Sequence, residues 1–178
     1  MRSYLGNSKK INLKNKAIKL NYTKSNIARG AIIYSAGDTI AAFLLDEFSM
    51  YRLLGMVLIG ATVYAFEIPN YFAWIDQKTA SYTGVKKTMA KTGLAIAYFN
   101  PIWIWRHLVF IKLFSGQFEQ INLHLWYIAG MSFLVNIPIS FIANYGIQNK
   151  INLRWRFLAS ALFSALMAIY YAMSETLF

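Results

Sequence analysis

The segment QINLHLWYIAGMSFLVNIPISFIANYGIQN, residues 120–149, decides the fold class, because none of its side chains carries a formal charge. A helix needs about 20 mainly apolar residues to cross the ~30 Å hydrocarbon layer of a bilayer. This segment is long enough, and four other apolar stretches have comparable lengths. We expect membrane-spanning helices over residues 27–45, 53–75, 93–114, 125–145 and 157–174.

The composition points to the same class. Of the 178 residues, 57% are hydrophobic and only 14% are charged, whereas soluble domains average about 45–50% apolar and about 25% charged residues. The chain has no cysteine, which excludes a disulfide scaffold and thiolate chemistry. We therefore predict an all-α integral membrane bundle of about five transmembrane helices. It forms a single domain, residues 27–178, after a basic juxtamembrane arm, residues 1–26. An alternative has four full spans and one interfacial helix.

The charges predict an orientation for this bundle. Lysine and arginine are concentrated in the N-terminal arm, in the segment after the second span and in the segment after the fourth span. The other connections are not basic, so basic and non-basic segments alternate as five crossings require. Because Lys and Arg are retained on the inner side of a membrane, the N-terminus is predicted inside and the C-terminus outside.

The N-terminal arm is basic and contains no acidic residue. Each base near an anionic membrane surface contributes on the order of 1 kcal/mol of binding. We expect contacts with lipid headgroups from Lys9, Lys10, Lys14, Lys16 and Lys19. The arm is loosely similar to a mitochondrial targeting segment and lacks the apolar core of a secretory signal. Nucleic-acid binding is not expected, since this basicity lies beside a membrane anchor.

Three ionisable residues, Asp38, Glu67 and Arg106, fall inside the expected spans. A charge at mid-bilayer costs roughly 2.5–3.5 kcal/mol, so it usually faces a partner or water. At ~1.5 Å per residue the three residues lie roughly 12–20 Å from the inner side. They are predicted to share a central layer, with an Asp38–Arg106 or a Glu67–Arg106 ion pair. Such a pair either fixes helix packing or lines a solute path. In a third arrangement the span covers 88–105, Arg106 is interfacial and 107–118 lies flat.

Four amides extend this intramembrane polar layer: Asn70, Asn100, Asn136 and Asn144. Pro69, Pro101 and Pro138 lie within a few residues of them. Proline leaves a backbone carbonyl without its helical partner, and a nearby amide or water can satisfy it. The pattern indicates either kinked helices bonded to their neighbours or a hydrated cavity.

The last span carries small residues four apart: Ser160, Ser164, Ala168 and Ala172. This spacing lets helix backbones approach closely, within the bundle or against another protein.

Catalytic patterns are absent from the sequence. His107 and His124 have no helical pairing and no carboxylate cluster beside them. There is no glycine-rich phosphate loop and no nucleophile elbow. We therefore predict a protein that is not an enzyme, with no cofactor and no metal site.

Several positions follow the pattern of a known family. They are Gly37-Asp38, Arg52, Met56, Gly60, Tyr71-Phe72, Ile75-Asp76, Lys86-Lys87, Pro138 and Asn144-Tyr145. With these positions the chain resembles, over roughly residues 30–174, the 22-kilodalton peroxisomal membrane protein family, which includes small mitochondrial inner-membrane proteins. Where the family has Gly-Pro, Asp-Gln and Gln, this chain has Ala65-Phe66, Lys91-Thr92 and Phe141.

The resemblance implies a small multi-span protein linked to non-selective channels and organelle homeostasis, usually with four spans. Two functions stay open at this point. One is a channel for small solutes. The other is a structural accessory subunit, among other membrane subunits, of an assembly such as a respiratory complex. The mitochondrial inner membrane is the expected location, with a peroxisomal or bacterial inner membrane as alternatives.

Overall fold

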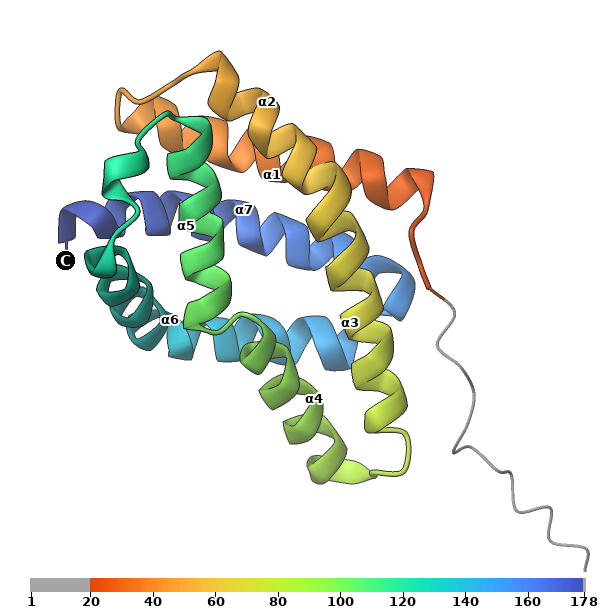
Figure 1. Cartoon of the computed structure of the whole chain (residues 1–178). Coiled ribbons are helices and arrows are strands. Elements are labelled where there is room, and N and C mark those ends of the chain that lie inside the picture. The colour runs from red at the N-terminus through yellow and green to blue at the C-terminus, as the bar shows by residue number, and fades with distance from the viewer. Residues whose placement is uncertain (1–19, 178) are drawn as a thin grey trace, which may run out of the picture.

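The computed structural model describes residues 20–177, and within that range every regular element is a helix (Figure 1). In chain order the helices are α1 (Lys24–Leu44), α2 (Met50–Ile59), α3 (Ala65–Lys78), α4 (Gly84–Tyr98), α5 (Pro101–Phe114), α6 (Leu123–Lys150) and α7 (Leu153–Leu177). A π-helical turn, Gly60–Tyr64, joins α2 to α3, and a short 3₁₀ turn, Phe118–Gln120, precedes α6. The all-α class is thereby confirmed. The five arm lysines predicted to contact lipid lie outside the described residues.

Five helical segments are long and apolar enough to cross a membrane: Lys24–Leu44, Met50–Lys78, Gly84–Phe114, Leu123–Lys150 and Leu153–Tyr171. They fit an integral membrane protein and agree with the five expected stretches to within five residues at each end, except that the third segment begins nine residues earlier than expected. The starts of α1 and α7 lie on the right of Figure 1 and the start of α4 at its lower right, and the α1–α2 and α5–α6 connections lie on the left. The end on the right is called the basic end below, because it carries most of the lysines and arginines outside the arm.

The third segment is broken, where the sequence suggested one continuous helix over 93–114. α4 ends at Tyr98 and α5 begins at Pro101. Proline has no N–H for the helical ladder, and its ring forces the preceding residue out of the helical region. Asn100 accordingly has an extended ψ of 176°. Beyond the break α5 packs against α2 and α6.

Backbone contacts between small residues hold α1 in place. A Cβ atom built on Gly30 would lie 2.1 Å from the carbonyl oxygen of Gly60, and one built on Gly60 would lie 2.3 Å from that of Gly30. A Cβ on Gly37 would lie 2.7 Å from Cα of Ala165 in α7. The buried Ser160 belongs to the stripe of small residues predicted from the sequence. α7 packs along α1, so close approach of small residues occurs inside the bundle.

The Gly30–Gly60 contact gives a stability prediction. Replacing either glycine with alanine inserts a methyl group into a backbone–backbone contact, so we expect a loss of about 1–3 kcal/mol. The controls are Gly93→Ala and Gly130→Ala, because a Cβ at either of these helical positions meets nothing within 4 Å. Those two should be neutral or slightly stabilising. Thermal unfolding in detergent measures the difference. Equal unfolding midpoints for all four variants would contradict the contact.

The five-segment arrangement gives a topology prediction. Because the chain has no cysteine, single cysteines can be introduced at exposed connections without background. Ser81→Cys and Asn152→Cys should react with an impermeant maleimide from one side of a vesicle, and Gln120→Cys from the other. Reaction of all three from the same side would contradict five crossings.

Candidate functional site

Three acidic residues in the helices each form an ion pair with an arginine, and the pairs lie at different levels of the bundle. Near the end opposite the basic end, Arg52 Nε and Nη2 donate to Asp38 Oδ2 and Oδ1, both at 2.9 Å. Arg52 Nη1 also donates to Glu47 Oε2 at 3.1 Å. The Arg52 and Asp38 side chains are only 2% and 1% exposed. This pair joins the end of α1 to the start of α2 in a dry environment.

The second pair lies beside the break between α4 and α5. Arg106 Nη1 and Nη2 donate to Glu67 Oε1 and Oε2 at 2.9 and 2.6 Å, and the Tyr98 hydroxyl donates to Glu67 Oε2 at 2.8 Å. Here the two charged side chains are 31% and 33% exposed. A cavity of about 160 Å³ opens beside them. We call these residues the central niche: Glu67, Tyr98, Asn100, Ile102, Trp103 and Arg106.

Two hydrogen-bond donors in the central niche have no partner among the described residues. They are Arg106 Nε and Trp103 Nε1, both shielded from solvent. Glu67 lies eleven residues before the end of α3, roughly 16 Å from that end along the helix axis. The central niche therefore combines a partly exposed ion pair with open volume, inside a segment long and apolar enough to cross a membrane. Such a combination suits water or a small polar solute.

The third pair lies at the basic end. Arg156 Nη1 lies 2.8 Å from both oxygens of Asp76, and Lys91 Nζ lies 2.5 Å from Asp76 Oδ1. Arg156 Nε also donates to the carbonyl of Ile151 at 2.9 Å. One carboxylate thus joins α3, α4 and α7.

The residues that were predicted to share one polar layer lie at different levels of the bundle. Of the two ion pairs considered from the sequence, Glu67–Arg106 is present, and Asp38 pairs with Arg52 instead of Arg106. Asp38 lies only six residues before the end of α1, so the single central layer is wrong for this residue. Its partner Arg52 falls just before the expected span 53–75, but it is buried at the third position of α2.

The four predicted amides serve separate roles. Asn100 caps α5 by accepting from the Trp103 N–H at 3.1 Å, and Asn70 accepts from the Asn21 N–H at 2.7 Å. In α6 the buried Asn136 donates to the Tyr171 hydroxyl at 3.2 Å, and Asn144 donates to the Ser140 carbonyl at 2.9 Å. Asn100 thus fixes the start of α5 and Asn70 the segment before α1, and the last two stabilise α6 and its contact with α7. Only Asn100 borders the central niche.

The sequence did not predict a buried hydrogen bond between Tyr64 and His107. The Tyr64 hydroxyl and His107 Nδ1 are 2.8 Å apart, and the His107 ring stacks on Trp103 at 5.5 Å. Tyr64 lies in the π-helical turn and His107 in α5, 43 positions apart, so no local spacing reveals the pair. Within residues 20–177 no group of three His, Cys, Asp or Glu side chains is arranged to hold a metal ion.

Comparison with protein-family models, with curated proteins and with solved structures found no match. The resemblance to the 22-kilodalton peroxisomal membrane protein family therefore depends only on the residues quoted for it.

The buried Asp38–Arg52 ion pair gives a prediction about stability. Asp38→Asn leaves the buried Arg52 guanidinium without its main counter-charge, and we expect a loss of about 3–5 kcal/mol. The double variant Asp38→Leu/Arg52→Met should lose clearly less than the sum of its two single variants, because no charge is left buried alone. As a control, Glu47→Gln removes a carboxylate that is 36% exposed and should cost about 1 kcal/mol or less. Strictly additive losses in detergent unfolding would argue against the buried pair.

Proposed function

We propose that this chain is a non-enzymatic membrane protein that conducts a small polar solute through the central niche. The observation that supports this is the partial exposure of the Glu67–Arg106 pair inside a spanning segment. Charged groups at membrane depth face protein or water and avoid lipid, because contact with hydrocarbon costs several kcal/mol. A pair that is about one third exposed therefore requires a polar neighbour on its open side, and a solute path provides one.

The broken third segment supports the same proposal. Irregular backbone at membrane depth is tolerated where it is buried in protein or lines a water-filled cavity. Discontinuous helices often form the substrate site of transporters near mid-membrane. The break at Phe99-Asn100 borders the central niche, and its cavity volume exceeds the roughly 15 Å³ that one water molecule needs.

A second function accounts for the same exposure. If another membrane subunit covers the open side of the central niche, the chain is a structural accessory subunit and needs no solute. We also propose that the N-terminus lies on the inner side of the membrane, because the basic segments alternate with non-basic ones. The mitochondrial inner membrane is the proposed location, on the basis of the acid-free arm and the quoted resemblance.

Flux through reconstituted liposomes separates these functions. Glu67→Gln leaves Arg106 as an unpaired cation and should shift permeability toward anions. Arg106→Gln leaves Glu67 unpaired and should shift it toward cations. We expect opposite shifts, each of several-fold in the ratio of anionic to cationic solute efflux.

The matched control is Glu119→Gln, which removes an exposed carboxylate from the 3₁₀ turn, far along the chain from the central niche. It should leave the efflux ratio unchanged. Liposomes that stay sealed at every voltage would contradict conduction. Sealed liposomes together with a co-purified subunit that crosslinks to the central niche would establish the accessory role instead.

A further inference from the structure

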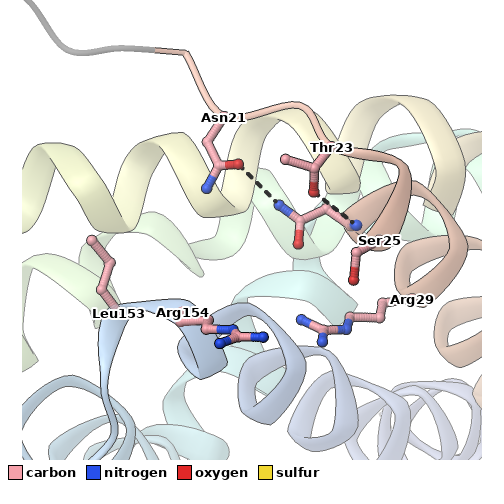
Figure 2. A pocket seen from close by; sticks show the side chains of 7 residues that line it. Asn21, Thr23, Ser25, Arg29, Leu153 and Arg154 are labelled. Atoms are coloured by element: carbon pink, nitrogen blue, oxygen red, sulfur yellow. Dashed lines mark hydrogen bonds between the residues drawn. The ribbon is translucent and has the colours of Figure 1, made fainter.

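A cavity of about 540 Å³ opens at the basic end, where α1 and α7 begin (Figure 2). Its lining residues come from the segment before α1, from the first turns of α1 and from the start of α7. They are Asn21, Thr23, Ser25, Asn26, Arg29, Leu153 and Arg154. We call it the arginine cavity. It is separate from the central niche, with which it shares no lining residue.

Two helix N-termini meet at this cavity. α1 and α7 pack against each other and both begin at the basic end, so their positive dipole ends point the same way. The Thr23 hydroxyl caps α1 by accepting from the Asn26 N–H at 3.2 Å. Neither helix has an acidic residue in its first turn, although acidic residues are favoured there. The positive field of the two ends is therefore not balanced by local carboxylates.

Two arginines add full charges to this field. In Figure 2 the guanidinium groups of Arg29 and Arg154 extend toward one another across the cavity. Both lie over the Trp155 ring, 5.0 and 5.3 Å from its centroid, which places the two guanidinium carbons no more than about 10 Å apart. In the part of the chain that the structure describes, neither forms a salt bridge. Residues 1–19 contain no Asp or Glu, so the arm has no carboxylate to offer them.

The contact with Trp155 does not remove the need for an anion. A cation–π contact at an exposed site contributes about 0.5–1 kcal/mol and holds a guanidinium in place, but it neutralises no charge. The residues that line the arginine cavity include no acidic side chain. The planar guanidinium matches the oxygens of phosphate in a bidentate manner, and helix N-termini bind the same group through their free N–H donors.

We propose that the arginine cavity binds a phosphate group between Arg29 and Arg154. The cavity lies at the ends of two spanning segments, where lipid phosphates are found, so the group comes from an anionic phospholipid headgroup or from a soluble phosphate. The proposal is independent of conduction through the central niche.

The test uses the full chain in detergent. Binding of short-chain phosphatidylglycerol and, separately, of inorganic phosphate is measured through the ligand-dependent rise in the unfolding temperature. The test variant is Arg29→Gln/Arg154→Gln. The control Lys78→Gln/Lys86→Gln removes two charges from the same end. Each control lysine also lies over an aromatic ring, at 5.7 and 4.7 Å, and neither lines the arginine cavity.

We expect the test variant to bind phosphatidylglycerol about tenfold more weakly, and the control to stay within about twofold of the original chain. A response to phosphatidylglycerol alone identifies a lipid site, and an equal response to millimolar phosphate identifies a soluble ligand. Equal losses in both double variants, or no loss in either, would overturn the proposal. If the test variant does not fold, the single variants Arg29→Gln and Arg154→Gln should each lose severalfold in affinity, and unchanged affinity in both would overturn it equally.

Discussion

An acidic side chain among apolar helices needs an opposite charge beside it, and three such ion pairs link neighbouring helices of the bundle. Asp38 joins α1 to α2, Glu67 joins α3 to α5, and Asp76 joins α3 to α4 and α7. A buried ion pair is seldom more stabilising than apolar side chains of equal volume, but a wrong neighbour leaves a charge unpaired at a cost of several kcal/mol. We interpret the three pairs as constraints on arrangement more than as sources of net stability.

The three prolines show how context decides whether a helix continues. Pro69 and Pro138 lie inside α3 and α6, and both helices continue through them. At Pro101 the helix ends, and Asn100 caps the new helix that follows. The break turns Tyr98 and Arg106, on either side of it, toward the same carboxylate of Glu67. An uninterrupted helix would separate these side chains by eight residues, or roughly 12 Å, so the central niche depends on the proline.

How much of the structure could be predicted depends on how far apart along the chain the interacting residues lie. Five apolar stretches are local properties, so the helices could be located to within several residues. The partner of Asp38 depends on how α1 turns into α2, and Arg52 fell outside the expected spans because the apolar stretch begins only at residue 53. The Glu67–Arg106 pair was one of two alternatives, since depth alone does not distinguish facing helices. The Tyr64–His107 bond and the Gly30–Gly60 contact join distant segments, for which a single sequence contains no signal.

The same charge rule explains why the two ends of the bundle differ from its middle. At the basic end Arg29 and Arg154 lack carboxylate partners among the described residues, and the membrane surface that we propose there would supply water and phosphate. The Asp38–Arg52 pair is complete and excludes solvent. The central niche differs from both, because its Glu67–Arg106 pair is complete but about one third exposed. In the membrane that we propose, lipid tails offer no hydrogen bonds to this open side, so the proposed occupant is polar: a solute, water or another chain.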